Sequence, residues 1–263
     1  MQRNNGKRPE LGISARQREI LSRVREQGFV AIEALAKAFD VTPQTARRDI
    51  NALCRKGLLR RYHGGAGLPS TVENVAYSTR RVLNLEGKRR IAELVARHVP
   101  EQASLFVTLG TTTEEAARAL REHQGLRVIT NNLQVAIMLS GNASLEVMVA
   151  GGMVRARDAG ITGEAAIDFF RNFKVDIALM GISSIELDGG LFDFDFREVR
   201  VLRTVMANAR RVWLLADYSK FGRNALVRVG EIAEVDALFT DRQPPDALTR
   251  LLADSDTAVY LAD

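Results

Sequence analysis

The sequence predicts an α/β protein in two parts, a small N-terminal winged helix-turn-helix and a larger open α/β domain. Before residue 66, three short amphipathic helices lead into a basic, β-like run. After residue 100, short apolar strands alternate with helices, which is typical of a mainly parallel sheet. With 263 residues and 46% hydrophobic content, the second part has enough chain to bury a core of its own.

The first two helices are predicted from hydrophobic spacing. Apolar residues recur on one helical face in residues 16–27, and Gly28 ends that helix. A second, shorter amphipathic helix occupies residues 32–39 and stops before Asp40. These two helices lead directly into a third.

The third helix starts within the sequence VTPQTARRDI at residues 41–50. Thr42 is suited to cap it, and Pro43 suits its first position because the missing N–H of proline removes no helical hydrogen bond there. The residues predicted to face the core are Ala46, Ile50 and Leu53. The residues predicted to contact DNA are Thr42, Gln44, Thr45, Arg47 and Arg48. The alternative is that the two arginines belong to an ordinary solvated face.

A predicted wing follows, with the sequence LLRRYHGG at residues 58–65. We interpret it as a short strand that is charged on one side and is closed by a flexible diglycine. We expect Arg60, Arg61 and His63 to contact the DNA backbone or the minor groove.

Charge and composition divide the chain further. Residues 1–65 carry fourteen lysines and arginines against six acidic residues, a net charge of about +8, whereas the remainder carries about −3. The head is therefore the part predicted to bind a polyanion. The predicted segments are a disordered extension at 1–13, a DNA-binding domain at 14–66, a surface linker at 67–85 and a ligand-sensing α/β domain at 86–263.

Several classes of protein are excluded by the composition. The chain has no apolar run of membrane-spanning length and no signal-peptide pattern at its start, so we expect a cytoplasmic protein. Cys54 is the single cysteine and cannot form an internal disulfide, so we expect a packed thiol. The three histidines have no metal-ligand spacing. We therefore expect neither a metal nor a cofactor.

The second domain is predicted to be an open sheet with helices between its strands. Strands are predicted at 104–109, 126–130, 145–149, 175–180, 211–216, 236–240 and 258–261. Helices are predicted at 87–98, 114–123, 133–140, 165–173, 199–208 and 246–252. Such sheets bind ligands beyond the carboxyl ends of their strands, where helix N-termini present free N–H groups.

Polar groups suited to an anion follow four of these strands. The candidate ligand-binding residues are Gly110, Thr111, Thr112 and Thr113 after the first strand, Asn131 and Asn132 after the second, Gly151 and Gly152 after the third, and Lys220 after the strand that ends near residue 216. Their combination predicts a phosphate pocket.

Each of these groups also has a purely structural explanation. Thr111 and Thr112 have the capping-box spacing to Glu114 and Glu115. The two asparagines are placed to cap the next helix, the glycine pair to form a tight turn, and the lysine to lie on a solvated surface.

The sequence resembles the DeoR family of bacterial transcriptional regulators, which join a winged helix to a sensor domain similar to sugar-phosphate isomerases. The matching segments are TPQTARRDI at 42–50, RYHGGA at 61–66, GTT at 110–112, TNN at 130–132, AGG at 150–152 and DYSKFG at 217–222. Ala46 departs from the larger aliphatic residue common in the family, which puts the local core packing in doubt but leaves the DNA-contacting face intact.

Three further segments are similar to the members of this family that control glycerol metabolism, namely 157–164, 194–200 and 219–225. The resemblance implies a repressor of glycerol uptake and catabolism whose inducer is glycerol 3-phosphate. It also implies a homo-oligomer, a dimer or tetramer, that binds a repeated operator. The phosphate ligand would favour a sensor conformation in which the heads no longer match the half-site spacing.

Two other functions compete with this interpretation. A sugar-phosphate isomerase would need acid/base carboxylates in its pocket, but the turn Gly181-Ile-Ser-Ser after the fourth strand has hydroxyls there instead. A constitutive DNA-binding structural protein would need the basic head but none of the pocket groups. A ligand-controlled repressor that is not an enzyme accounts for both features, and another sugar phosphate remains an alternative inducer.

Overall fold

The computed structural model describes residues 13–27, 29–56, 58–62, 64–67, 74 and 76–263. The chain divides into two compact units, Met1–Pro69 and Ser70–Asp263. The first we call the head and the second the sensor. The expected disordered extension, apart from Ile13, lies outside the described residues. No helix of the described part is long and apolar enough to span a bilayer.

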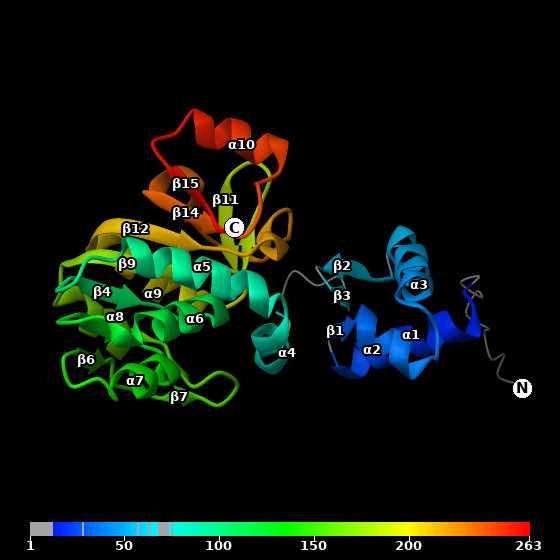
Figure 1. Ribbon diagram of the computed structural model, residues 1–263, viewed down its shortest axis with the longest axis horizontal. Helices are drawn as coiled ribbons and strands as arrows, with labels where there is room; N and C mark the ends of the chain where they lie inside the picture. The colour runs from blue at the N-terminus through cyan, green and yellow to red at the C-terminus, as the bar shows by residue number, and fades with distance from the viewer. Residues whose placement is uncertain (1–12, 28, 57, 63, 68–73, 75) are drawn as a thin grey trace, which may run out of the picture. The chain divides into compact units, whose positions relative to one another are not determined.

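The head has the predicted winged helix-turn-helix architecture (Figure 1). Its described helices and strands are α1 (Ala15–Gln27), β1 (Phe29–Ala31), α2 (Ile32–Ala38), α3 (Pro43–Arg55), β2 (Arg60–Tyr62) and β3 (Gly65–Gly67). The strands form a sheet in the order β1-β3-β2. Ile20, Leu35, Ile50 and Leu53 form the centre of its core, and Ala46 is buried among them. Strand β1 was not predicted.

The sensor is built on a seven-stranded sheet in the order β15-β14-β12-β9-β4-β5-β6, and all neighbouring strands are parallel. The strands are β4 (Ser104–Val107), β5 (Arg127–Thr130), β6 (Glu146–Val149), β9 (Val175–Gly181), β12 (Ala209–Leu215), β14 (Ala237–Thr240) and β15 (Ala258–Leu261). All seven predicted strands are confirmed, with boundaries within two residues.

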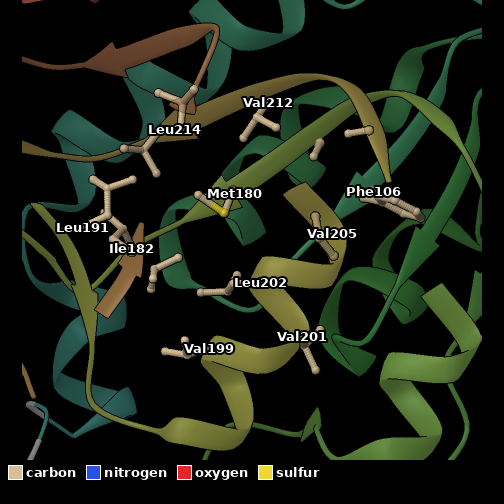
Figure 2. Packing of buried hydrophobic residues seen from close by; sticks show 14 of the residues in the cluster. Phe106, Met180, Ile182, Leu191, Val199, Val201, Leu202, Val205, Val212 and Leu214 are labelled. Atoms are coloured by element: carbon tan, nitrogen blue, oxygen red, sulfur yellow. The ribbon is translucent and has the colours of Figure 1, made fainter. Parts of the chain in front are cut away.

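Helices cover both faces of the sheet (Figure 1). They are α5 (Leu85–His98), α6 (Thr111–Ala119), α7 (Leu133–Leu139), α8 (Glu164–Arg171), α9 (Phe196–Ala207) and α10 (Asp246–Ala253). Alternate residues of a strand point to opposite faces: Ile177 and Leu179 pack with α5, α6 and α7, whereas Ala178 and Met180 pack with α8, α9 and α10. Figure 2 shows part of the core on the side of the sheet that α8, α9 and α10 cover, with Leu202 and Val205 of α9 near Met180. The six helices were predicted because each has one apolar face.

The order in which the chain adds strands reverses between β4 and β9, which are neighbours in the sheet. On one side the chain runs outward through β5 to β6, and on the other through β12 and β14 to β15. Connections after the two central strands therefore leave in opposite directions, which opens a crevice at their carboxyl ends.

The sensor also contains smaller elements that were not predicted. They are α4 (Tyr77–Val82), β7 (Val154–Arg155), β8 (Gly160–Ile161), β10 (Ser184–Ile185), β11 (Gly190–Asp193) and β13 (Val227–Glu231), together with the short 3-10 helices η1 (Leu120–Glu122), η2 (Tyr218–Lys220) and η3 (Ile232–Glu234). Strands β10, β11 and β13 form an antiparallel sheet of their own. The span expected as a linker, 67–85, thus contains a helix.

Candidate functional site

Helix α3 presents the polar face that the sequence predicted. Gln44, Arg47 and Arg48 are exposed, and Thr45 is half-buried. Thr42 Oγ1 accepts a hydrogen bond from the N–H of Thr45 at 3.2 Å, as expected of an N-cap. The exposed donors on α3 suit base edges and phosphates of a major groove.

Buried Asp49 fixes the rotation of α3. Its carboxylate is 7% exposed and accepts hydrogen bonds from Arg16 Nε at 2.6 Å and Gln17 Nε2 at 2.9 Å, both on α1. Because these bonds hold one face of α3 against α1, the two arginines before Asp49 are directed to solvent. The partners of Asp49 were not evident from the sequence.

The wing is an antiparallel hairpin of β2 and β3. Arg61 is exposed, and its Nη1 lies 3.3 Å from Oδ1 of Asn51 on α3, so the wing and α3 are joined by a side-chain contact. Arg60 is half-buried. His63 lies outside the described residues.

The expected flexible diglycine is wrong for Gly65. This residue is buried in β3, and a Cβ added to it would clash with the carbonyl oxygen of Val30 and the ring of Phe29. Glycine is required there because β3 pairs with β1 and leaves no room for a side chain at this position. Gly65 is therefore a packing residue.

The loop after β4 forms a cradle at the start of α6. Gly110 is the N-cap residue, with a φ of 152°, and no side chain caps the helix. The capping-box alternative for Thr111 and Thr112 is therefore wrong, because both lie inside the first helical turn. Thr113 Oγ1 lies 2.8 Å from the carbonyl oxygens of Thr108 and Gly110, so this hydroxyl closes the loop. Thr111 and Thr112 line a cavity.

Lys220 reaches the same cavity from η2. Its side chain is buried, with 7% of the residue exposed, and in the described part of the chain no hydrogen bond or ion pair is recorded for its ammonium group. Burial lowers the pKa of Lys220 to about 7, although the charge of Asp217 opposes the shift. The charge of Asp217 acts on this ammonium group, but no direct ion pair holds it, so a phosphate in the cavity would supply a hydrogen-bonded counter-charge.

Asp217 connects this lysine to a second one. Burial would raise the pKa of Asp217, but the charges of Lys220 and Lys88 outweigh burial and lower it. Lys88 Nζ lies 3.8 Å from Asp217 Oδ2 and donates to the carbonyl oxygens of Arg80 and Leu83, at the end of α4. The cavity is thereby joined to α4 through buried charges.

Residues before α5 cover the crevice. Asn74 Nδ2 donates to Ser183 Oγ at 3.0 Å, and Arg223 Nη2 donates to Asn74 Oδ1 at 2.7 Å. Tyr77 donates its hydroxyl to Glu114 Oε2 at 2.8 Å. Burial and the charge of Glu114 raise the pKa of this tyrosine. The first described residues of the sensor thus contact helix α6 and the loop after β9 directly.

Two carboxylates enter the crevice from β11 and α9. Asp193 is 5% exposed, and burial together with the charge of Asp193 raises the pKa of Glu198 to about 7. Both line the cavity with Lys220. The expectation that the pocket lacks carboxylates was wrong, because it considered only the Gly181-Ile-Ser-Ser turn and these groups arrive from other elements.

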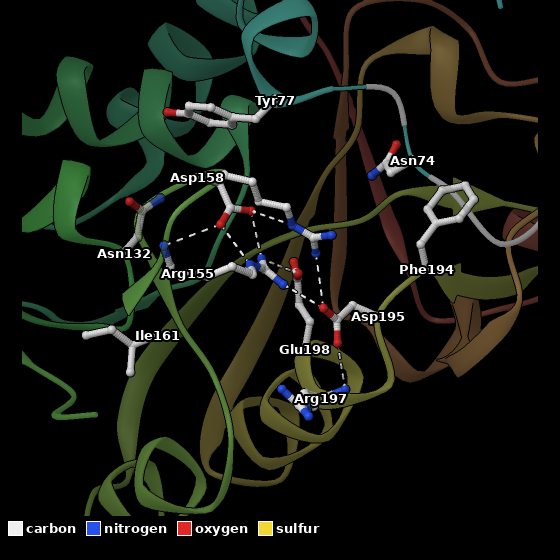
Figure 3. A network of polar contacts seen from close by, with 12 residues as sticks. Asn74, Tyr77, Asn132, Arg155, Asp158, Ile161, Phe194, Asp195, Arg197 and Glu198 are labelled. Carbon is white, nitrogen blue, oxygen red and sulfur yellow. Dashed lines mark hydrogen bonds and ion pairs between the residues drawn. The ribbon is translucent and has the colours of Figure 1, made fainter. Parts of the chain in front are cut away.

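An arginine-centred network holds Glu198 (Figure 3). Arg155 contacts Asp158 at 2.7 Å, Asp195 at 2.8 Å and Glu198 at 2.8 Å. Burial alone would lower the pKa of Arg155, but the hydrogen bonds to Asp158 and the charge of Glu198 raise it. The network ties the β7–β8 hairpin to the start of α9.

The crevice contains two cavities that share three lining residues, Arg80, Asp193 and Glu198. The cavity at the cradle measures about 20 Å³, which is room for about one water molecule. The neighbouring cavity measures about 240 Å³ and is also lined by Asn74 and Tyr77.

Besides Thr113, whose hydroxyl closes the cradle loop, four expected ligand residues lie outside both cavities. Asn131 Nδ2 donates to the carbonyl oxygen of Ile161 at 2.8 Å. Asn132 caps α7 and donates to Glu114 at 3.1 Å, so its structural explanation holds. Gly151 and Gly152 are exposed beyond β6, at the edge of the sheet. The expectation that these four residues join Lys220 in one pocket is corrected, because β5 and β6 lie to one side of the crevice.

Sequence reasoning missed several residues that the fold brings to the crevice, namely Asn74, Tyr77, Arg80, Lys88, Ser183, Asp193, Glu198 and Asp217. Asp217 and Ser183 immediately follow or lie near the ends of predicted strands and could have been found there. Asn74 lies before α4, and the rest lie on α4, α5, β11 and α9, where their sequence context resembles that of ordinary surface residues.

Comparisons with known proteins cover both units. Residues 16–72 match the model of the DeoR-like helix-turn-helix domain, and residues 83–242 match that of the DeoR C terminal sensor domain. The glycerol-3-phosphate regulon repressor of Escherichia coli K12 is 46% identical over 235 residues, which cover 89% of this chain and 93% of that protein. The HTH-type transcriptional repressor CsqR of the same organism is 44% identical over 252 residues, covering 96% and 97%.

A further relative and a distant structure complete the comparison. The glycerol-3-phosphate regulon repressor of Haemophilus influenzae Rd is 42% identical over 250 residues, covering 95% of this chain and 97% of that protein. Among solved structures, ribose 5 phosphate isomerase A from Neisseria gonorrhoeae is similar with a TM-score of 0.37 and 14% identity, over 51% of this chain and 52% of that one.

Proposed function

The chain belongs to the DeoR family of helix-turn-helix regulators, and from this membership we propose that it represses genes of glycerol 3-phosphate metabolism and leaves its operator when glycerol 3-phosphate binds the sensor. The relatives that carry this proposal align over both units. They are named as repressors, and the chain is accordingly a transcriptional repressor and not an isomerase.

The observation that supports an anionic effector most strongly is the surroundings of Lys220. This buried ammonium, the hydroxyls of Thr111 and Thr112, and the free N–H groups at the start of α6 all meet at the crevice between β4 and β9. Positive charge and several hydrogen-bond donors in one place match a phosphate monoester. We propose these groups, with Gly110, as its binding site.

In the head, the exposed face of α3 is the proposed DNA-reading surface. Gln44, Arg47 and Arg48 have the donor chemistry that reads base edges in the major groove. Arg61 lies beside α3 on the wing and is suited to the DNA backbone. We assign sequence recognition to the helix and general affinity to the wing, where we also place Arg60 and His63.

The narrow cradle supports release by a population shift. Its cavity of about 20 Å³ is lined by Arg80 and the adjoining cavity by Asn74 and Tyr77, so we expect an effector that occupies both to displace these residues. These residues immediately precede α5 and follow the head in the chain. An effector that binds only the open sensor would change the placement of the heads, with a coupling of about 1 to 3 kcal/mol.

A thermal-shift screen tests the effector. The full-length protein is heated with glycerol 3-phosphate, glucose 6-phosphate, ribose 5-phosphate or inorganic phosphate, and operator release is then measured by fluorescence anisotropy. Glycerol 3-phosphate is expected to raise the melting temperature and to release the DNA. Stabilisation by none of the phosphoesters would contradict the proposal.

The second candidate is a repressor of the same family with a different sugar-phosphate effector. The similarity to CsqR, at 44% identity over 96% of this chain, is almost as high as that to the glycerol-3-phosphate regulon repressor. A response to glucose 6-phosphate or ribose 5-phosphate without a response to glycerol 3-phosphate would favour it.

We also propose a homodimer or homotetramer that acts in the cytoplasm, where operator DNA is found. Repeated operators are matched by symmetric oligomers, since each half-site needs its own head. Light scattering of the purified protein, alone and with operator, measures the number of subunits. A monomer in both samples would contradict this part of the proposal.

A further inference from the structure

The two cavities of the crevice differ in chemistry. At the cradle lie Lys220 and the threonine hydroxyls, which suit an anion. In the wall shared with the larger cavity lie the carboxylates of Asp193 and Glu198. A ligand that occupies both cavities therefore meets donors at one end and acceptors at the other.

Asp193 has an unused acceptor that faces this space. Its Oδ1 accepts the backbone N–H of Phe194 at 2.6 Å, whereas no partner of Oδ2 is recorded among the described residues. The residue is 5% exposed and lines both cavities. This oxygen is therefore able to accept a further hydrogen bond, which a ligand hydroxyl would donate.

Glu198 is close to Asp193, and one of its two carboxylate oxygens already accepts a hydrogen bond. Its Oε2 accepts from Arg155 Nη2 at 2.8 Å, and no partner of Oε1 is recorded among the described residues. Burial and Asp193 raise the pKa of Glu198, which shows that the two carboxylates interact. Two neighbouring acidic groups accept hydroxyl hydrogens well but disfavour a further negative charge.

The arginines that line the larger cavity do not fully neutralise the negative charge of Asp193 and Glu198. Arg157 Nη2 lies 3.1 Å from Asp195 and its Nε lies 3.7 Å from Asp158, so its guanidinium is already paired. Arg80 lines both cavities. Lys220 lines the cradle cavity alone, whereas the carboxylates of Asp193 and Glu198 lie in the wall that the two cavities share.

Resting on the proposed function, we propose that Asp193 and Glu198 bind the hydroxyl groups of the effector and set its specificity. The sensor then selects a small monophosphate whose tail is hydroxylated and uncharged. It discriminates against a phosphoester with an apolar tail, which leaves the carboxylates without donors, and against one with an anionic tail, which they repel.

Three phosphoesters separate these contributions. Glycerol 3-phosphate has the hydroxylated tail, propyl phosphate has the same length without hydroxyls, and 3-phosphoglycerate has a carboxylate at the end of its tail. Calorimetric titration of the full-length wild type is expected to show at least about tenfold tighter binding of glycerol 3-phosphate than of either other ligand.

Substitution of Asp193 is expected to remove part of this selection. In Asp193→Asn, affinity for glycerol 3-phosphate should fall about tenfold, affinity for propyl phosphate should stay unchanged, and affinity for 3-phosphoglycerate should rise. Glu198→Gln is the second variant and should act in the same direction. Asp168→Asn on the exposed face of α8 is the matched control and should leave all three affinities unchanged.

The possible outcomes distinguish this inference from the proposed function. Equal binding of the three ligands to wild type, tighter binding of 3-phosphoglycerate, or an unchanged preference in both carboxylate variants would overturn the inference while the phosphate-responsive repressor stands. Failure of all three ligands to bind wild type would overturn the proposed function as well.

Discussion

The ammonium group of Lys88 lies 3.8 Å from Asp217 Oδ2 and also donates to the carbonyl oxygens of Arg80 and Leu83 on the segment before α5. Asp217 interacts on its other side with Lys220, the cation of the proposed phosphate site. Charge added at Lys220 therefore changes the electrostatic interaction of Lys220 with Asp217. Because Asp217 also pairs with Lys88, the change reaches the hydrogen bonds by which Lys88 holds the end of α4. This is a physical route by which effector binding can reach the chain segment that leads to the head.

Lys88→Met is expected to lower the free energy of unfolding of the sensor by about 3 kcal/mol. Removing one partner of a buried ion pair leaves the other charge uncompensated. Urea unfolding followed by the fluorescence of Trp213, the single tryptophan, measures the sensor directly. Lys174→Met, at an exposed position, is the control and should change stability by less than about 0.5 kcal/mol. Equal losses in both variants would contradict the role of Lys88.

Thr112→Ala and Lys220→Met are each expected to spare operator binding and to impair release. Losing a charge-assisted bond to phosphate should weaken effector affinity by about 1.5 to 3 kcal/mol. Operator affinity is measured with and without glycerol 3-phosphate. Gly151→Ala is the control, because a Cβ at this position meets no atom within 4 Å. Wild-type release in both cavity variants would show that the phosphate binds elsewhere.

Arg47→Ala and Arg48→Ala are expected to weaken operator binding by about 1 to 3 kcal/mol for an arginine that reads a guanine. Arg61→Ala should instead weaken binding to operator and scrambled DNA alike and reduce the salt dependence, because a wing contact to phosphate carries no sequence information. Arg171→Ala, an exposed charge change on α8, is the control. Full operator affinity in both helix variants would exclude α3 as the recognition helix.

Effector binding at pH 8 is expected to take up protons. The pKa of Lys220 is lowered to about 7 by burial and by the charges of Arg223, Lys88 and Arg80, against the opposing charge of Asp217, so much of this amine is neutral at pH 8. A phosphate dianion beside it raises the pKa again and recharges it. Affinity should therefore fall as pH rises above about 7.

Calorimetry at pH 8 in buffers of different ionisation enthalpy counts these protons. The uptake should approach one proton per site in wild type and should disappear in Lys220→Met, while Lys174→Met retains it. Proton release at pH 8, or equal uptake in wild type and Lys220→Met, would be inconsistent with a neutral Lys220 in the unbound sensor.

Local patterns in the sequence were enough to predict most of the fold. Thr42 and Pro43 start α3 as expected because capping and the restricted φ of proline depend only on neighbouring residues. Strands such as β9 and β12 were recognisable because a strand buried on both faces is continuously apolar. The short strands β10 and β11 were missed, since two to four residues are too few to show a period.

The sequence was therefore sufficient to derive the order of elements, the class of fold, the basic face of α3 and the polar groups Thr112 and Lys220 at two strand ends. Which of these groups share a cavity depends on how the chain packs. The strand order places β4 and β9 at the crevice and β5 and β6 to one side, so Asn131 and Gly151 are excluded. It also brings in Asp193 and Glu198, whose burial and charge interaction depend on contacts between segments far apart in the chain.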